Sequence, residues 1–558
     1  MSSNKVCILL KKSYIFTQVK VMERSFYMRK IFSVMICMLL AACTVSGSAF
    51  EKSSGFDPEQ PLNRILFKLW QDKNIKYPAS ASDAVFLRRV TLTAAGRLPT
   101  ADEARDFIFD DTPGKHARLI EKILNSAGYA DMQTMRFADM LRIKSEFPIN
   151  LWPNAVQIYH RTIHYELLAD RSLKSMFYDL LTASGSNFRT AHANFFRASA
   201  DRSPLGLAKM VLLTTMNMRE SEFSKEELEQ FAKLFSTVRY KSTYEWKEEI
   251  VYNDIVPQTI KAMLPDGNEI IIDTGKVDPR KVFADWLLND ENDYFARAMT
   301  NRVWYWVFGK GIYPQADALP RLPEKSSFLG KLFGVKTVAS GEQPFSEELQ
   351  NYLIAEFKKN NYSLKHLYRL IMNSAAFQAS AVNQDELALQ NFAAYPVRRM
   401  ESELLIDALA SITRGYDQYM SVIPEPFTYL PNTSKAVTIA DGSISTGTLD
   451  SFGRPPRDSG QFSERNTAST DSQGLYLMNS AALYRRINNY CRNLMRKGYD
   501  DDSRLDQVYL DVLSRYPTNR ERQVFKKYRE GLDRRSRHLV WSDTVWVLFN
   551  SKEFIFYH

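Results

Sequence analysis

The stretch AAGRLPTADEARDFI, residues 94–108, contains the end of one helix and the start of the next. Gly96 and Pro99 interrupt a helix, because glycine is conformationally free and proline lacks a backbone N–H. Thr100 followed three residues later by Glu103 is the pattern of a capping box, in which two side chains satisfy free backbone N–H groups of the new helix. The stretch therefore predicts two consecutive helices joined by a short turn.

A second stretch near the other end of the chain has the same pattern. In LSRYPTNRERQVF, residues 513–525, Pro517, Thr518 and Glu521 stand in the same relative order. Each stretch follows an apolar helical pattern and precedes an Asn-Ser pair, in NSAGYAD at 125–131 and in NSKEF at 550–554. Two explanations stay open: a remote internal duplication, or two uses of a common helix start.

The rest of the pattern predicts a mainly α protein. Apolar residues recur at helical spacing from PLNRILFKLW onward, and the 558 residues contain only 22 glycines and 22 prolines. One segment differs: TIKAMLPDGNEIIIDT, residues 259–274, alternates apolar and polar residues around Pro-Asp-Gly, which predicts a hairpin. We expect two helical domains, residues 60–247 and 277–554, with a small β-hairpin connector at 248–276.

Residues 1–49 read as a leader and the start of a tether. From Met28 the chain has a basic start, an apolar run at 31–42 and then small residues, the pattern of a secretory signal peptide. The apolar run is too short to span a bilayer as a helix. Leu-Ala-Ala-Cys at 40–43 resembles a bacterial lipobox, which predicts lipidation of Cys43, and cleavage after Ala49 is the competing interpretation.

The net charge of +9 does not indicate nucleic acid. Residues 1–42 carry seven basic residues against Glu23 alone, so only +3 belongs to the rest of the chain. Outside the leader the one cysteine is Cys491, which excludes an intramolecular disulfide there and predicts a small buried apolar side chain.

Two polar stretches are the candidate functional loops. The first is TLDSFGRPPRDSGQFSERNTASTDSQGLYLMNS, residues 448–480, where both charge signs crowd around helix-breaking residues. Arginine forks suit carboxylate, sulfate or phosphate, so Arg454, Arg457, Arg465 and Asn466 are candidate ligand-binding residues. The alternative is structural: the arginines pair with Asp458, Glu464 and Asp471 and join two helical layers.

The second stretch is TASGSNFRTAHANFFRASADR, residues 182–202. Its aromatic rings beside polar side chains suit a carbohydrate or another polar ring ligand. The candidate ligand-binding residues here are Asn187, Arg189, Asn194 and Arg197. Equally, the stretch reads as a loop pinned in place by its own phenylalanines.

Eight spaced motifs carry a resemblance to a known family. They are FLRRVTLTAAGRLPT, SGSNFR, YKSTYEWKEEIV, NRVWYWVFGKGI, SLKHLYRLIMNSAAFQAS, YPVRRMESELLIDAL, FGRPPRDSGQFSERN and LYLMNS. In this order they resemble the bacterial paired domains of unknown function 1549 and 1553, the planctomycete cytochrome-associated type. The resemblance implies an exported envelope protein. Many relatives carry a cytochrome c-like domain, but this chain has no CxxCH, so we predict no haem and no other cofactor.

The sequence leaves three functions open, and it leaves open whether the protein is an enzyme. The first is a periplasmic or outer-surface protein, membrane-anchored through its lipid, that binds polysaccharide or an envelope protein. The second is a glycan hydrolase, with Asp450, Asp458 and Glu464 as acid and base and His192 as a proton carrier. The third is a part of an extracytoplasmic redox assembly. His160 and His164 lie one turn apart, but without an HExxH pattern we predict no metal site.

Overall fold

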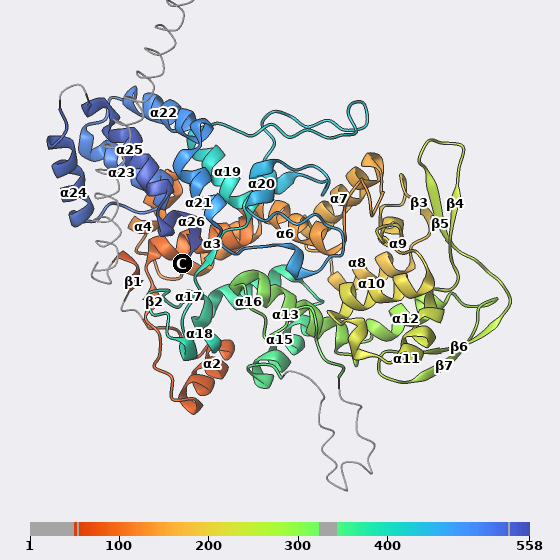
Figure 1. Ribbon diagram of the computed structural model, residues 1–558. Helices are drawn as coiled ribbons and strands as arrows, with labels where there is room; N and C mark the ends of the chain where they lie inside the picture. Colours follow the sequence, from red (N-terminus) through yellow and green to blue (C-terminus); the bar gives the residue numbers. More distant parts are fainter. Residues whose placement is uncertain (1–48, 53–54, 323–342, 534–535) are drawn as a thin grey trace, which may run out of the picture. The chain divides into compact units, whose positions relative to one another are not determined.

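The computed structural model describes residues 49–52, 55–322, 343–533 and 536–558 of the chain. The predicted leader up to residue 48, with its lipidation site Cys43, lies outside the described residues. Within the described ranges the chain forms helices and a few short antiparallel strand pairs, which confirms the predicted mainly α fold (Figure 1). In those ranges, no helix is both long enough and apolar enough to cross a membrane.

The chain forms two compact units, which we describe separately. The main unit comprises residues 50–473 and 556–558, and the C-terminal unit comprises residues 474–555. Helix α21, Asp471–Asn479, contains the boundary. The predicted domains 60–247 and 277–554 divide the chain elsewhere, and that division stays a prediction.

Helices make up most of the main unit. They are α2 (Pro61–Asp72), α3 (Asp83–Ala95), α4 (Ala101–Phe109), α5 (Lys115–Leu124), α6 (Ala127–Met140), α7 (Pro153–Leu168), α8 (Leu173–Thr182), α9 (Asn194–Arg197), α10 (Pro204–Met216), α11 (Lys225–Ala232), α12 (Pro279–Leu287), α13 (Tyr294–Phe308), α15 (Glu347–Lys359), α16 (Leu364–Asn373), α17 (Ala375–Gln378), α18 (Glu386–Gln390), α19 (Ser402–Thr413) and α20 (Gly447–Ser451). Short 3₁₀ helices add η2 (Ala191–Ala193), η3 (Glu220–Glu222), η4 (Lys233–Phe235), η5 (Ala436–Thr438) and η6 (Phe462–Glu464).

The strands of the main unit form four small antiparallel sheets. They are β1 (Glu51–Lys52) with β2 (Ser80–Ala81), β3 (Gly185–Ser186) with β5 (Glu249–Asn253) and β4 (Val238–Ser242), β6 (Thr259–Met263) with β7 (Glu269–Asp273), and β8 (Arg398–Arg399) with β9 (Phe556–Tyr557). The β6–β7 hairpin confirms the prediction from the Pro-Asp-Gly turn. The sheet of β3, β5 and β4 was not predicted, and β3 comes from the polar stretch 182–202.

The core of the main unit contains helices that are buried on nearly every side. All residues of α13 except Tyr305 are buried, and α13 packs against α10 and α15. Helices α3 and α6 are also largely buried and pack against each other. Such helices still carry charges, among them Arg136 in α6 and Arg302 in α13. Because a buried charge is costly without partners, these arginines define where the site should be sought.

The first capping box forms as predicted. Glu103 N donates to Thr100 Oγ1 at 3.1 Å, and Thr100 N donates to Glu103 Oε2 at 2.9 Å. The structure adds two features to the pattern. Gly96 ends α3 with a φ of 61°. The Arg97 guanidinium donates hydrogen bonds to both Glu103 carboxylate oxygens, at 2.7 and 2.8 Å.

The C-terminal unit repeats this arrangement. It contains α22 (Ala481–Met495), α23 (Asp501–Leu513), α24 (Asn519–Glu530), η7 (Arg537–Leu539), α25 (Val540–Phe549) and α26 (Lys552–Ile555). Ser514 ends α23 with a φ of 60°, Thr518 and Glu521 form the capping box, and Arg515 grips both Glu521 oxygens at 2.8 Å. This correspondence beyond the helix start favours an internal duplication. Cys491 of α22 is buried as predicted, and burial raises its pKa to about 12.

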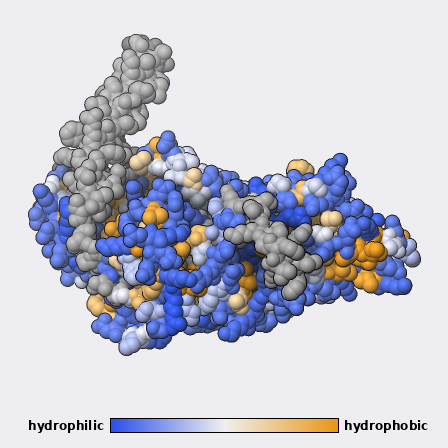
Figure 2. Space-filling model, turned by 90° about the horizontal axis from the view of Figure 1, so that it is seen from below, coloured by the Kyte–Doolittle hydropathy of each residue, from blue (hydrophilic) through white to orange (hydrophobic). Residues whose placement is uncertain are grey.

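The surface is mostly polar. Figure 2 shows a face on which hydrophilic residues dominate and hydrophobic residues gather in separate patches. Exposed aromatic side chains occur in loops of the main unit, including Phe147, Trp246 and Tyr429, which are 80%, 70% and 70% exposed. Single exposed apolar residues are normal, but a group of aromatic rings around a hollow indicates a binding surface.

Candidate functional site

The first polar stretch, 448–480, is only partly a loop. Its ends belong to α20 and α21, so the irregular segment runs from residue 452 to 470 and includes η6. Thr446 caps α20 by accepting from Leu449 N at 3.2 Å, a helix start that the polar composition concealed. Gly453, with a φ of 81°, then turns the chain out of the helix.

The arginines of this segment pair with carboxylates on helices. Arg457 Nε donates to Asp139 Oδ1 of α6 at 2.9 Å. Arg465 binds Asp139 Oδ2 at 2.7 Å and Glu403 Oε2 of α19 at 2.6 Å. Arg454 Nε lies 3.4 Å from Glu403 Oε1. The segment is thereby fastened to α6 and α19.

The predicted pairing of these arginines with acids of the same stretch is wrong. Asp458 instead pairs with Lys144 at 2.6 Å, and Glu464 Oε1 accepts from Ser459 N at 2.5 Å. Asp471 is exposed in the first turn of α21. Arg454 and Arg457 are buried, and the carboxylates that they reach belong to helices: Glu403 has 1% and Asp139 20% of its side chain exposed.

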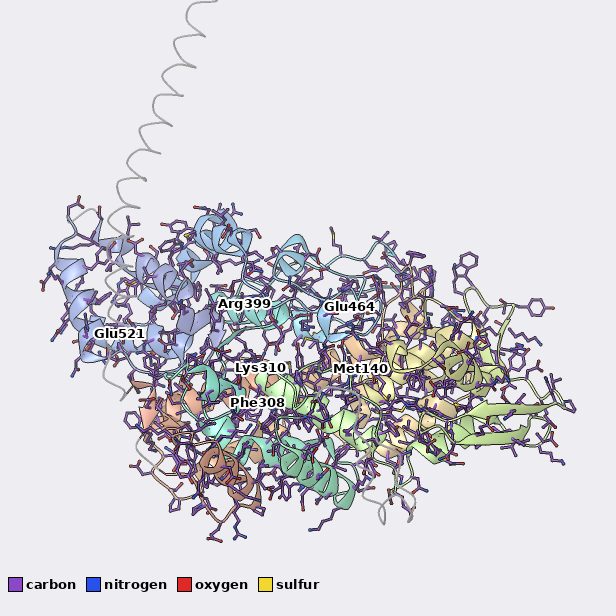
Figure 3. The ribbon with its side chains drawn as sticks, turned by 60° about the horizontal axis from the view of Figure 1, so that its bottom comes forward. Met140, Phe308, Lys310, Arg399, Glu464 and Glu521 are labelled. Carbon is purple, nitrogen blue, oxygen red and sulfur yellow. The ribbon has the colours of Figure 1, made fainter. Side chains whose placement is uncertain are left out.

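A cavity of about 100 Å³ lies where this segment meets the helices. Its wall contains Met135, Arg136, Asp139, Met140, Arg302, Tyr305, Trp306, Gly309, Arg398, Glu401, Pro455, Gly460, Gln461, Phe462, Arg465 and Thr467. Figure 3 labels Met140, together with Arg399 and Glu464, which adjoin the wall residues Arg398 and Arg465. We call this space the arginine cavity.

Glu401 is the carboxylate held most firmly in its ionised form at the arginine cavity. Burial would raise the pKa of Glu401, but Arg398 at 3.2 Å and Arg136 at 4.0 Å oppose it and lower the pKa to about 2. The Tyr557 hydroxyl also donates to Glu401 Oε2 at 2.6 Å. Glu401 is therefore a fixed anion and unsuited to act as a proton donor near neutral pH.

Arg302 is the least compensated cation of the wall. It makes no ion pair with any residue that the structure describes, and its Nε is buried without a hydrogen-bond partner. Its Nη2 binds Asn217 Oδ1, and its guanidinium stacks 4.7 Å from the centre of the Phe462 ring. Burial lowers the pKa of Arg302 to about 9, and the opposing charge of Asp317 offsets this only in part.

A second, more open hollow lies beside the three-stranded sheet. It measures about 200 Å³ and is lined by Ser145, Glu146, Phe147, Asn150, Trp152, Arg197, Lys247 and Ile423. We call it the Trp152 groove. Its residues come from the α6–α7 loop, from α9, from the β4–β5 turn and from the loop after α19.

Aromatic rings surround the Trp152 groove. The Trp152 ring packs edge-on against Phe427 with centroids 5.3 Å apart. Lys247 Nζ lies 5.3 Å from the centre of the Trp152 ring and 5.2 Å from that of Trp246. Phe147 lines the groove as well and is 80% exposed. The groove is therefore bordered by several aromatic rings, and the ammonium group of Lys247 lies near two of them.

The Trp152 groove contains an unpartnered polar atom and unusual backbone geometry. Glu146 Oε1 is buried and has no hydrogen-bond partner among the described residues. Asn150, Trp152 and Lys247 have φ angles of 59°, 71° and 63°. Asparagine adopts a left-handed backbone more readily than most residues, but this backbone is costly for a bulky residue such as tryptophan, and strain of this kind concentrates at functional sites.

Two predicted ligand-binding residues make contacts that hold the segments of this groove together. Asn187 is buried, and it donates to Lys247 O at 3.2 Å and accepts from Glu249 N at 2.9 Å. Arg197 lines the groove, pairs with Glu249 at 2.7 Å and donates to Leu151 O at 3.3 Å. They hold the β4–β5 turn and the residue before Trp152 in place.

The other predicted residues lie outside both hollows. Asn194 is buried and donates to Asn187 O, Arg189 pairs with Glu245 at 3.1 Å, and His192 lies 3.0 Å from Glu166. Asp450 binds the Ser445 hydroxyl, and Asn466 is exposed. With Asp458 and Glu464 engaged as described, none of the proposed acid–base residues lines either space. Their catalytic role stays a prediction.

The two polar stretches approach each other across one side chain. Arg142 Nε donates to Ala198 O at 2.7 Å, and a Cβ at Gly460 would lie 2.9 Å from Arg142 Nη1. Each stretch nevertheless contributes to a different hollow, Arg197 to the groove and Arg465 to the cavity.

Sequence reasoning missed most of the residues that line these spaces. Arg136, Asp139 and Arg302 line the arginine cavity and lie within helices whose neighbouring positions are mostly buried. A charge at a position where the helix is buried on every side is a usable signal, because such a charge requires a partner. For the groove the signal is the aromatic, proline-containing loop FPINLWPN at residues 147–154.

Across the described ranges, no three His, Cys, Asp or Glu side chains are grouped so that they could hold a metal ion. His164 Nε2 lies 3.0 Å from Asp131, while burial lowers the pKa of His160 to about 3.

Comparisons with known proteins give two family matches. The model PSCyt2, described as a protein of unknown function (DUF1549), matches residues 61–240. The model PSD1, described as a protein of unknown function (DUF1553), matches residues 279–328 and 333–529. No curated protein matches the chain. No solved structure matches it either.

Proposed function

The chain belongs to the family that pairs the DUF1549 and DUF1553 domains, and we propose that it binds polysaccharide in the Trp152 groove. The observation that carries this proposal is that Glu146, whose Oε1 has no hydrogen-bond partner among the described residues, lines the same groove as Trp152. A sugar ring presents an apolar C–H face and a rim of hydroxyls. An aromatic face with hydrogen-bonding groups at its edge matches both.

Glu146 and Lys247 supply complementary hydrogen-bonding groups. An ionised carboxylate only accepts hydrogen bonds, and an ammonium only donates them. A hydroxyl does both, so a ligand rich in hydroxyls can satisfy the two side chains together. A free carboxylate oxygen would repel an acidic sugar at the same position. We therefore expect a neutral polysaccharide.

The extent of the aromatic platform favours a polymer over a single sugar. The groove holds roughly one sugar ring, because its volume is about that of six or seven water molecules. Beyond it, Trp246 is 70% exposed and Phe427 is 40% exposed. Neighbouring sugars of a chain can rest on these rings and add their contacts to those of the first.

The location that we propose for this binding is the cell envelope. The leader at residues 1–49 supports export, and the lipobox supports a lipid anchor on Cys43. Both fit a protein that handles polysaccharide at the periplasmic or outer surface. Turnover of the bound glycan would add the hydrolase activity, whereas a haem or metal spectrum of the purified protein would favour the redox assembly instead.

A glycan-array screen of the purified full-length protein tests this proposal. We expect binding to neutral polysaccharides that Trp246→Ala weakens by about tenfold, the loss of one stacking contact. Tyr77→Ala is the matched control, since Tyr77 is 52% exposed and belongs to neither hollow. Equal losses in both variants, or no binding of any glycan by the wild type, would overturn the proposal.

A further inference from the structure

The arginine cavity has more positive than negative charge in its wall. Arg136, Arg302, Arg398 and Arg465 line it, against Asp139 and Glu401. Ion pairs with residues outside the wall do not balance this excess of positive charge. Asp139 also pairs with Arg457. Glu403 pairs with both Arg454 and Arg465. Five guanidinium groups thus share three carboxylates, while Arg302 makes no ion pair within the described residues and only the charge of Asp317 acts on it in part.

The excess charge is buried. Arg136 and Arg302 are 4% and 2% exposed, and Arg398 has only 13% of its side chain exposed. An uncompensated buried cation costs several kcal/mol, so a counter-ion in the cavity would be strongly stabilised. The rings of Phe462 and Trp306, which face Arg302 and Arg136 at 4.7 and 5.6 Å, compensate a guanidinium only in part.

Unused donors accompany this charge. Arg302 Nη1 donates no hydrogen bond to any described residue, and Nε of both Arg302 and Arg398 is buried without a partner. By contrast, the neighbouring Arg399 binds the carbonyls of Phe452, Asn466 and Thr467 and needs no ligand. The wall therefore retains the donor capacity that planar or tetrahedral oxyanions require.

We propose that the arginine cavity binds a small oxyanion, a sulfate, a phosphate or a carboxylate, with Arg302 as its principal ligand. A space of about 100 Å³ holds one such group, which corresponds to a few water molecules, but not a sugar ring with its substituents. The anion thus arrives free, or as the charged end group of a larger molecule.

The bound anion would also lock the segment at 452–470. Gln461, Phe462 and Arg465 form one side of the cavity, and α6 and α13 form the other. Gly309 makes room for this arrangement: a Cβ there would lie 2.5 Å from Arg398 Cδ. An anion that bridges the two sides replaces unsatisfied donors with charge-assisted hydrogen bonds, so it should slow exchange of the amides at 452–470.

Titration calorimetry of the full-length protein with sodium sulfate, phosphate and acetate tests this inference, with chloride at matched ionic strength as the blank. We expect saturable binding of at least one oxyanion and about tenfold or greater weakening in Arg302→Gln. Arg239→Gln is the matched control, because Arg239 is half exposed and far from the cavity wall. Binding of a sulfated polysaccharide is compared with binding of its desulfated form. This comparison shows whether the cavity takes the charged end group of a larger molecule or a free ion.

Hydrogen exchange of the wild-type protein keeps the test decisive if Arg302→Gln fails to fold. Added oxyanion should slow exchange at residues 452–470 and leave the C-terminal unit unchanged. No heat of binding and no protection with any of the three anions would overturn the inference. The Trp152 groove is unaffected by either outcome, because its test uses neutral glycans and different residues.

Discussion

Arg465 and Asp139 form an ion pair of 2.7 Å between residues 326 positions apart in the chain. The pair joins the irregular segment after α20 to helix α6 and leaves the second Asp139 oxygen for Arg457. One carboxylate therefore holds two buried guanidinium groups, and the segment depends on it.

Asp139→Asn should destabilise the main unit by about 3–5 kcal/mol, because the variant leaves the buried Arg457 without a carboxylate partner and Arg465 with Glu403 alone. Urea unfolding followed by tryptophan fluorescence measures the loss. Asp102→Asn is the control, since Asp102 pairs with Arg105 at an exposed position where the carboxylate has 86% of its surface accessible. A loss no larger than that of the control would show that the segment is held by other contacts.

Acid should destabilise the protein through Glu401 and Glu403. The pKa of each is lowered to about 2 from an ordinary 4.5, so their contribution is fully present above about pH 4.5. It is lost as the pH falls from there towards 2. Each shift corresponds to stability on the order of 3 kcal/mol. We expect the free energy of unfolding to fall between about pH 4.5 and pH 2, and to fall less in Glu401→Gln. Identical pH profiles for the two proteins would contradict this.

Two glycines near the segment should respond oppositely to substitution by alanine. At Gly453 the φ is 81° and a Cβ would lie 1.9 Å from Asn466 O, whereas Gly447 begins α20 with no atom within 4 Å. Gly453→Ala should therefore cost more than about 2 kcal/mol, and Gly447→Ala should be neutral or stabilise by about 0.5 kcal/mol. Melting temperatures of both variants provide the check. A tolerated alanine at 453 would mean that the turn after α20 is built differently.

The arginines beside the two capping boxes should differ in how much stability is lost when each is replaced by glutamine. Arg515 has 7% of its side chain exposed and binds both Glu521 and Glu553, at 2.8 and 2.6 Å, whereas Arg97 has 33% exposed and pairs with one carboxylate among the described residues, that of Glu103. Arg515→Gln should cost about 3 kcal/mol and Arg97→Gln about 1 kcal/mol. Chemical unfolding of each variant measures this, and an equal or reversed order would contradict the structure.

The fold was largely predictable because its signals are local. Two capping boxes and one hairpin turn depend only on residues a few positions apart, and all three form in the structure. They are Thr100 with Glu103, Thr518 with Glu521, and the Pro-Asp-Gly turn. The first polar stretch was recognised as unusual for a correct reason, since its arginines are buried and need partners.

The site was less predictable because it depends on distant pairs. Arg465 meets Asp139 and Glu403 only after the whole main unit has folded, and no local pattern states which carboxylate an arginine will reach. The Trp152 groove likewise combines Glu146, Lys247 and Ile423 from three separate segments. Charges at positions buried on every side are the signal that would have pointed to the cavity.

The most direct test of the polysaccharide proposal is the binding isotherm of wild type and Glu146→Gln on the strongest neutral glycan from the array. Glutamine keeps the shape of the side chain but replaces one acceptor oxygen with a donor. The account predicts an unchanged melting temperature and affinity reduced by about tenfold, the cost of one charge-assisted hydrogen bond. Unchanged affinity in Glu146→Gln would contradict it and remove the Trp152 groove as the binding site.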